Sequence, residues 1–63
     1  MPIISVQMFE GRDSVKKQNL VRELTDAYVR SCGGEKESVT VILNDVSKND
    51  WAKGGKLFNE EKM

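Results

Sequence analysis

The sequence contains no histidine, and this absence narrows the chemistry that the chain can perform. Without histidine there is no Ser-His-Asp or Cys-His catalytic arrangement, and the commonest metal ligand is missing. One cysteine and no histidine also argue against a structural zinc site, so we predict no bound metal. Acid–base chemistry near neutral pH therefore requires another group whose pKa is shifted toward neutrality.

The sequence also lacks the means to form a disulfide bond within one chain, because Cys32 is its only cysteine. A chain of 63 residues is short, and a lone hydrophobic core of this size rarely contributes more than ~3–5 kcal/mol. Chains of this kind usually depend on disulfides, on a metal or on partner subunits. We therefore expect a single domain over residues 1–63 that associates with other copies of itself.

Neither an excess of one charge nor a long apolar run occurs in the sequence. Ten basic residues balance ten acidic ones, so no basic stripe points to nucleic acid. No apolar run approaches the ~18 residues of a membrane span, and the N-terminus has neither a basic leader nor an A-x-A-type cleavage site. We expect a cytoplasmic protein that binds neither nucleic acid nor membranes.

The first half of the sequence predicts a strand followed by a long helix. Residues 3–9 carry apolar side chains that alternate between two sides, which is typical of a strand. Residues 14–32 have apolar side chains at spacings of three and four, which indicates a helix. Asp13 stands where the helix needs an N-cap, and Gly33 stands where it ends. The same stripe includes Cys32, which we predict to be a small buried side chain.

The second half predicts another strand and a short hairpin. Residues 39–46 begin with β-branched side chains and continue as an apolar run, as in a strand covered on both faces. Residues 51–58 predict a hairpin with Gly54 and Gly55 at its tip, and the polar tail 59–63 is expected to be irregular. The expected fold class is therefore α+β, with a single right-handed β-α-β unit of two parallel strands, one long helix and a short C-terminal hairpin.

One face of this predicted sheet has no element to cover it. A single helix covers one face, and the other face, which we expect to be rich in valine and isoleucine, stays open. We predict that another subunit covers it. The pattern of the sequence thus favours an oligomer independently of the chain's small size.

Several short motifs lie in a constant register over nearly the whole chain. They are Met1-Pro2-Ile3 at the start, Glu10-Gly11-Arg12 before the predicted helix, Val21-Arg22-Glu23 within it, Arg30-Ser31 near its end and Lys53-Gly54-Gly55 near the C-terminus. No single motif is specific. The set, with proline directly after the first methionine in a chain of this length, resembles the 4-oxalocrotonate tautomerase (2-hydroxymuconate tautomerase) family of the tautomerase superfamily.

The resemblance implies an isomerase without a cofactor that interconverts enol and keto forms of unsaturated 2-oxo acids. It implies homohexamers, built as trimers of dimers, and removal of the initiator methionine. The N-terminal proline, here Pro2, carries the proton. An arginine matching Arg12 binds a substrate carboxylate, and a bulky aromatic residue lines the pocket. That residue is usually phenylalanine and is Trp51 in this sequence.

Thr40 marks a departure from the family's pattern. The archetype has a second arginine at this position, where it holds and polarises the 2-oxo acid end of the substrate. Other members of the family also vary there. We keep Thr40 among the predicted substrate-binding residues and expect a backbone N–H, a water or a hydroxyl to supply the missing donor.

Pro2 is suited to act as a base once Met1 is removed, because its nitrogen is then a free secondary amine and not an amide. A free α-amino group titrates near ~7.7–8.0, and desolvation or a nearby arginine lowers that pKa. Such an amine is partly unprotonated near neutral pH and is still basic enough to remove an acidic enol or α proton.

The predicted strand order separates Pro2 from Arg12 within one chain. A strand over residues 3–9 is more than about 20 Å long at ~3.3 Å per residue, and both Arg12 and Trp51 follow the far end of a strand. Thr40 lies at the same edge as Pro2, because parallel strands begin on the same side. We therefore predict a site shared between copies, to which neighbours contribute Arg12 and Trp51.

Two alternatives stay open. Relatives with this fold hydrate or dehalogenate unsaturated acids with a carboxylate that activates water, and Asp50 is the acidic residue beside Trp51. The other alternative is an oligomeric protein of the same fold without enzyme activity, which the threonine at position 40 and a retained Met1 would favour.

Overall fold

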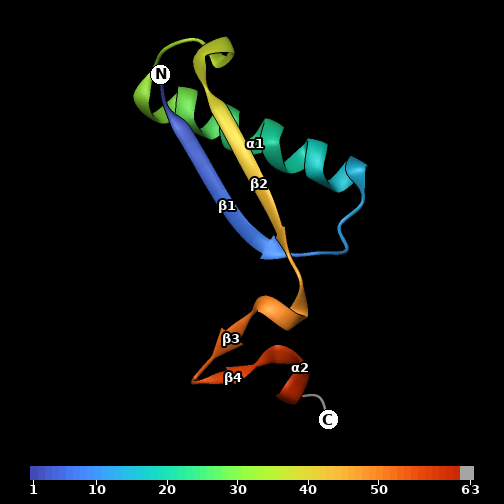
Figure 1. The fold of residues 1–63 in the computed structure, drawn as a ribbon. Helices are drawn as coiled ribbons and strands as arrows, with labels where there is room; N and C mark the ends of the chain where they lie inside the picture. The colour runs from blue at the N-terminus through green and yellow to red at the C-terminus, as the bar shows by residue number, and fades with distance from the viewer. Residues whose placement is uncertain (62–63) are drawn as a thin grey trace.

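The computed structural model describes residues 1–61, which form an open βαβ unit with a small hairpin attached to one end (Figure 1). The molecule is elongated, with principal extents of 46 × 24 × 15 Å, because the hairpin projects away from the sheet. The elements, in chain order, are β1 (Ile3–Phe9), α1 (Ser14–Cys32), the 3-10 helix η1 (Lys36–Ser38), β2 (Thr40–Val46), the 3-10 helix η2 (Lys48–Asp50), β3 (Ala52–Lys53), β4 (Lys56–Leu57) and α2 (Phe58–Glu61).

The bounds of β1 and α1 are those that the sequence predicts. For α1, the interactions at its two ends explain the agreement. The backbone of Asp13 is extended, and its carboxylate accepts a hydrogen bond of 2.8 Å from the backbone N–H of Lys16. This bond satisfies a donor of the first turn that has no partner within the helix. Gly33 ends α1 with φ 83°, a backbone conformation that strains other residues, while its N–H donates to the Val29 carbonyl.

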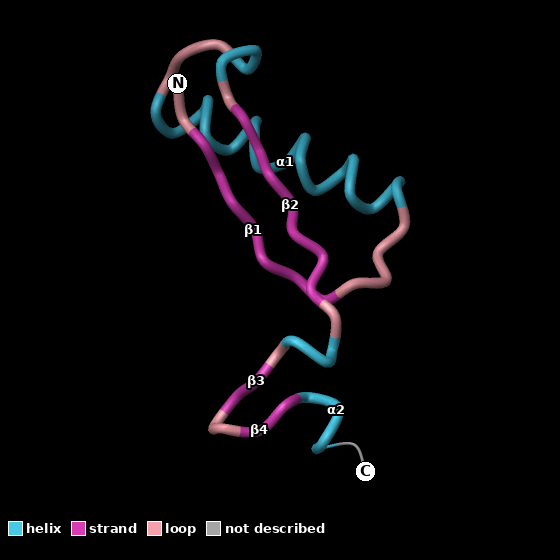
Figure 2. Tube along the Cα trace, viewed as in Figure 1, coloured by secondary structure: helices cyan, strands magenta, loops and turns pink. Residues whose placement is uncertain are grey.

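The predicted parallel pairing of the two long strands is confirmed. β1 and β2 pair from Ile3 opposite Thr40 to Phe9 opposite Val46. Figure 2 shows the two strands side by side, with α1 lying across one face of the sheet. The sheet has only these two strands, so the outer edge of each strand has no neighbour within the described chain.

The second strand begins at Thr40, one residue later than the sequence predicts. Val39 ends the turn η1 instead, because its N–H donates a hydrogen bond of 3.1 Å to the carbonyl of Lys36. The β-branched run alone does not distinguish the last residue of this turn from the first residue of the strand.

The two faces of the sheet differ in what covers them. Towards α1, Ile4, Val6 and Met8 of β1 are half-buried, and an ion pair between Lys17 of α1 and Asp45 of β2 ties the helix to the sheet. On the open face, Ile3 is 66% exposed and Ile42 is 43% exposed.

The open face is less apolar than the sequence predicts. Ser5, Gln7 and Asn44 are exposed there between the apolar positions. Within the part of the chain that the structure describes, no side chain is fully buried. A single copy therefore has no enclosed hydrophobic core, which favours association.

The predicted hairpin is confirmed, with β3 and β4 antiparallel and Gly54 and Gly55 between them. Both glycines have positive φ, 63° and 83°, as tight two-residue hairpin turns require. The irregular tail expected over 59–63 is wrong for its first part, since α2 extends to Glu61. Residues 62–63 lie outside the described chain.

Cys32 is exposed in the single copy, so its predicted burial is wrong. The reason is its place in the last turn of α1. Residues 30–38 are all exposed, which shows that the final turn extends beyond the sheet that covers the middle of the helix. Within residues 1–61, no helix combines the length and hydrophobicity that crossing a membrane requires.

Candidate active site

Pro2 directly precedes β1 and is held beside the start of β2. The backbone N–H of Thr40 donates a hydrogen bond of 3.0 Å to the Pro2 carbonyl oxygen, and Thr40 pairs with Ile3 in the sheet. Pro2 is half-buried, whereas Met1 before it is 92% exposed. The parallel sheet thus brings Pro2 and Thr40 together at one edge, in agreement with the predicted geometry.

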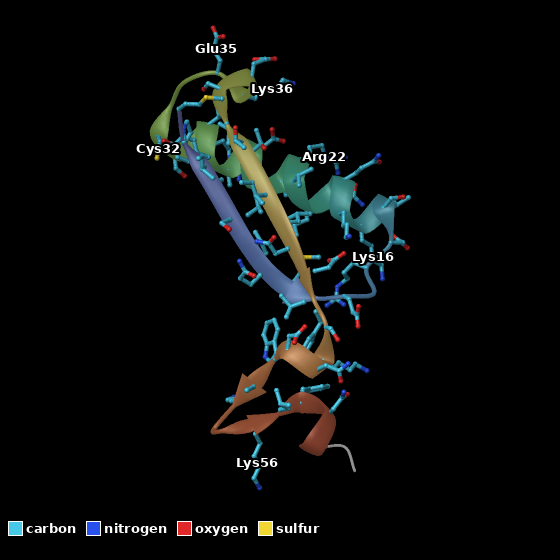
Figure 3. All side chains as sticks on the ribbon, in the orientation of Figure 1. Lys16, Arg22, Cys32, Glu35, Lys36 and Lys56 are labelled. Atoms are coloured by element: carbon cyan, nitrogen blue, oxygen red, sulfur yellow. The ribbon has the colours of Figure 1, made fainter. Side chains whose placement is uncertain are left out.

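Arg12 lies at the opposite end of β1, in the loop that leads into α1. Its side chain lines a hollow of about 320 Å³ between β1 and the first turns of the helix, together with Val6, Met8, Lys16 and Leu20. The apolar side chains of this lining come from β1 and α1. The two cations, Arg12 and Lys16, come from the loop after β1 and the first turn of α1. Figure 3 shows Lys16 near the end of β1 and Cys32 near the beginning of that strand.

Trp51 belongs to an aromatic cluster at the same end of β1 as Arg12. The cluster consists of Phe9, Trp51 and Phe58. The ring centroid of Phe9 lies 4.4 Å from that of Trp51 and 4.7 Å from that of Phe58, with tilted planes in both pairs. The Lys48 ammonium lies 5.9 Å from the centre of the Phe58 ring. Trp51 is therefore already packed against its own chain.

Sequence reasoning missed Phe9 and Phe58 as neighbours of Trp51. Phe9 is the last residue of β1, and Phe58 follows the hairpin immediately. The backbone N–H of Phe58 donates a hydrogen bond of 2.7 Å to the Trp51 carbonyl, which closes the base of the hairpin and brings both rings to Phe9. The one available signal was the aromatic character of the residues on both sides of the predicted hairpin.

The predicted site residues thus form two groups within one chain. Pro2 and Thr40 lie at one edge of the sheet, and Arg12 and Trp51 lie beyond its other end. The seven residues of β1 separate the groups, which corresponds to roughly 20 Å at ~3.3 Å per residue. Trp51 is not among the described residues that line the hollow of Arg12, so the second pair shares an end of the molecule without sharing a pocket.

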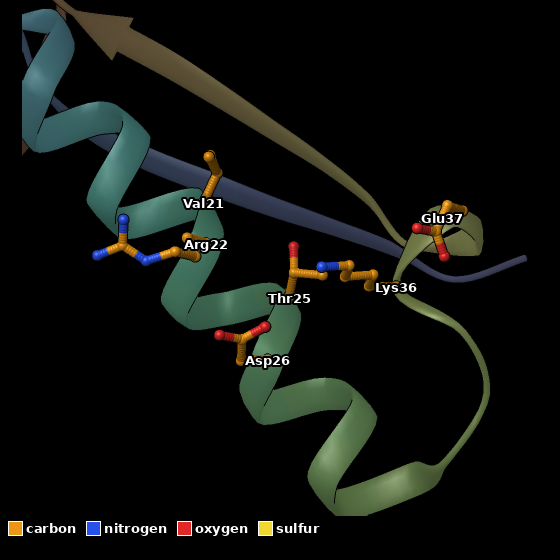
Figure 4. A pocket seen from close by; sticks show the side chains of 6 residues that line it. All are labelled: Val21, Arg22, Thr25, Asp26, Lys36 and Glu37. Atoms are coloured by element: carbon orange, nitrogen blue, oxygen red, sulfur yellow. The ribbon is translucent and has the colours of Figure 1, made fainter.

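A second hollow, of about 340 Å³, lies between α1 and the segment that contains η1 (Figure 4). Its polar lining carries two cations and two carboxylates. The lining residues are Val21, Arg22, Thr25, Asp26, Lys36 and Glu37. The formal charges of this lining therefore balance. Among the side chains of residues 1–59, no three from cysteine, aspartate and glutamate gather in a way that could hold a metal ion.

Known sequences resemble the chain over almost its whole length. The model of a protein family described as tautomerase enzyme matches residues 2–61. A probable tautomerase of Ralstonia nicotianae is 38% identical over 61 residues, which cover 97% of this chain and 94% of the relative. The 2-hydroxymuconate tautomerase of Bacillus subtilis is 33% identical over 60 residues, which cover 95% of this chain and 97% of the relative.

Solved structures agree with these relatives. A crystal structure of a 4-oxalocrotonate tautomerase homologue has 43% sequence identity and a TM-score of 0.87, and the match covers 95% of each chain. A heterohexamer 4-oxalocrotonate tautomerase from Chloroflexus aurantiacus has 28% identity and a TM-score of 0.88, covering 95% of this chain and 97% of that one.

Proposed function

Because the chain belongs to the tautomerase family and is an enzyme of the isomerase class, we propose that it interconverts enol and keto forms of unsaturated 2-oxo acids without a cofactor, with Pro2 as its base. The observation that carries this proposal is the family match over residues 2–61, which begins at Pro2 itself. The 33% identity to a 2-hydroxymuconate tautomerase supports a dicarboxylate of that kind as the substrate.

Removal of Met1 is the first requirement of the proposal. With Met1 attached, the Pro2 nitrogen is an amide without basic character, and cleavage converts it into a secondary amine. The 92% exposure of Met1 leaves the bond accessible to an aminopeptidase, and the residue exposed by cleavage is small. The hydrogen bond from the Thr40 N–H holds the Pro2 carbonyl, so the amine that cleavage exposes stays at the edge of the sheet.

The working form is a homo-oligomer, proposed here as a hexamer, whose copies complete one another's sites. The length of β1 prevents Arg12 from reaching the Pro2 of its own chain, so the two act together only across copies. The lack of any fully buried side chain among residues 1–59 supports association. The similarity to a heterohexameric relative supports the hexamer.

In the proposed mechanism, Arg12 binds a substrate carboxylate through two parallel N–H donors, which fixes the orientation of the substrate. Pro2 of a neighbouring copy removes a proton from the dienol oxygen or from carbon. Negative charge then develops on the carbonyl oxygen, and Pro2 returns the proton farther along the conjugated chain. Trp51 excludes water from the site, which keeps the amine partly unprotonated.

The carbonyl oxygen needs a hydrogen-bond donor as charge develops on it. The backbone N–H of Thr40 is already occupied by the Pro2 carbonyl. The Thr40 hydroxyl has no hydrogen-bond partner among the described residues. We assign the donor role to this hydroxyl, in place of the family's second arginine.

The experiment that tests the proposal uses protein freed of Met1, verified by intact mass. Enol-to-keto conversion of 2-hydroxymuconate and of phenylenolpyruvate is followed by absorbance. The Pro2→Ala variant replaces the secondary amine with a primary amine of different basicity and direction, and its kcat/KM should fall by about 10²-fold to 10⁴-fold. Turnover equal to the unmodified enzyme in this variant rejects Pro2 as the base, and no turnover of any enol by the Met-free enzyme rejects the proposed reaction.

A further inference from the structure

The hollow beside β1 combines an apolar floor with two positive charges. Val6, Met8 and Leu20 provide the apolar surface, and Arg12 and Lys16 provide the charges. No acidic side chain of the described chain lines this hollow. The other hollow, between α1 and η1, has cations and carboxylates in equal number. Of these two hollows, the one beside β1 has a net positive lining, and the lining of the other is neutral.

Both cations of this hollow are available to a ligand. Among the side chains of residues 1–59, neither the Arg12 guanidinium nor the Lys16 ammonium has an ion-pair or hydrogen-bond partner. Lys17, the next residue, differs because its ammonium is paired with Asp45 across the sheet. Of these two adjacent lysines, Lys17 therefore pairs with the sheet, and Lys16 stays unpaired beside Arg12 among the described side chains.

The backbone fixes the positions from which these two side chains extend. Arg12 directly precedes the N-cap Asp13, and Lys16 is the residue whose N–H that carboxylate binds at 2.8 Å. On the other side of the loop, the Glu10 N–H donates a hydrogen bond of 3.1 Å to the Val46 carbonyl. Both ends of the short loop are thus anchored. The Asp13 carboxylate caps the helix, and it forms no ion pair with either cation.

We propose that Lys16 is a specificity-determining residue, a second cation of the carboxylate site of Arg12 that makes the enzyme prefer substrates with two carboxylates. This inference rests on the proposed function. The Arg12 fork binds the distal carboxylate in two bonds, and the Lys16 ammonium adds a mobile point charge to the same group. The carbon chain of the substrate lies on the apolar floor. A monocarboxylate 2-oxo acid has its carboxylate beside the carbonyl, so it leaves the distal site empty.

The test compares the Met-free enzyme with Lys16→Gln on 2-hydroxymuconate, a dicarboxylate, and on phenylenolpyruvate, a monocarboxylate. For Lys16→Gln, the KM for the dicarboxylate should rise about two- to fivefold with little change in kcat, as expected for an exposed charge pair. The rise for the monocarboxylate should be smaller. Higher ionic strength should reduce the difference between the two enzymes, because salt screens exposed charges.

Lys36→Gln is the matched control, since it removes a lysine from the charge-balanced hollow on the other side of α1. Its KM values should equal those of the unmodified enzyme. Equal changes in KM for both substrates in Lys16→Gln, or no change for the dicarboxylate, overturn the proposal.

A binding measurement separates this inference from the proposed reaction. Adipate, a dicarboxylate that cannot tautomerise in this way, is titrated into the unmodified protein and into Lys16→Gln, and binding is followed by NMR chemical shifts. The proposal expects a Kd about two- to fivefold higher for the variant. Equal affinity overturns it, even if the enzyme is active. Absence of turnover with either enol rejects the proposed reaction, while the adipate titration still decides the role of Lys16.

Discussion

The ring of Phe9 lies 4.4 Å from the ring of Trp51, so the last residue of the first strand touches the first residue after η2. This contact joins the βαβ unit to the hairpin. Together with Phe58 it forms the aromatic cluster, the place where the projecting hairpin packs against the rest of the chain.

Replacing Phe9 with alanine should loosen the hairpin. The change removes two ring contacts of a half-buried side chain, and we expect the free energy of unfolding to fall by about 1–3 kcal/mol. Trp51 is the only tryptophan, so its fluorescence reports on the cluster directly. Its emission should shift to longer wavelength in Phe9→Ala, as the indole becomes more exposed to water.

Val15→Ala is a suitable control for this change, since Val15 is 63% exposed on α1 and lies outside the cluster. It should leave the emission unchanged. An unchanged Trp51 emission in Phe9→Ala would show that the hairpin packs without the Phe9 ring.

The N-cap of α1 can be tested by two substitutions at one position. Asp13→Ala removes the acceptor for the Lys16 N–H and should destabilise the protein by about 0.5–2 kcal/mol. Asp13→Asn keeps a side-chain oxygen at the cap and should recover most of that loss. Thermal unfolding at one fixed protein concentration measures both, because an associating protein has a melting temperature that depends on concentration.

The two variants also report on the loop that carries Arg12. If the cap holds this loop, Asp13→Ala should raise the KM for a dicarboxylate as well as lower the stability. A variant that melts earlier but binds substrate unchanged would mean that Glu10 alone anchors the loop.

A site shared between copies predicts complementation between two inactive variants. Pro2→Ala chains and Arg12→Ala chains are unfolded together in equal amounts and allowed to reassociate. If each site takes Pro2 from one chain and Arg12 from another, about a quarter of the sites in a random mixture have both residues intact. Activity should therefore return to roughly a quarter of that of the unmodified enzyme. Mixing the variants without unfolding them is the control, and a mixture that stays inactive after reassociation would place both residues in one chain.

The hydroxyl of Thr40 should matter more than the shape of its side chain. Thr40→Val keeps the branched side chain of a strand residue and removes the donor, so kcat should fall by about 10-fold to 10²-fold. Thr40→Ser keeps the hydroxyl and should retain most of the activity. Equal kcat values for the valine and serine variants would assign the donor to a water or to another group.

Local chemistry explains why the sequence predicts most of the fold. The carboxylate of Asp13 and the glycine at position 33 mark the ends of α1, and the alternating apolar side chains define β1. The start of β2 was misplaced by one residue, because the turn η1 depends on the hydrogen bond from Val39 to Lys36 and has no residue pattern of its own. Cys32 has the helical spacing of a buried residue, but its exposure depends on where the sheet stops covering the helix, which the spacing does not reveal.

The candidate site was predictable only in its coarse geometry. Parallel pairing of the two long strands is enough to predict that Thr40 lies beside Pro2 and that Arg12 lies at the opposite end of the sheet. The partners of Trp51 and the unpaired state of Lys16 follow from the paths of the hairpin and of the loop after β1. These paths depend on contacts between residues far apart in the sequence, which periodicity does not encode.

The absence of a fully buried side chain among residues 1–59 of a single copy has a consequence for the newly made chain. A polypeptide without an interior of its own gains its stability by mass action, so its folded fraction rises with the amount synthesised. At low expression the isolated copies should be degraded quickly, and above a threshold they should persist. Lifetime in the cell would then depend on gene dosage, and a pulse-chase measurement at graded expression levels would reveal that dependence.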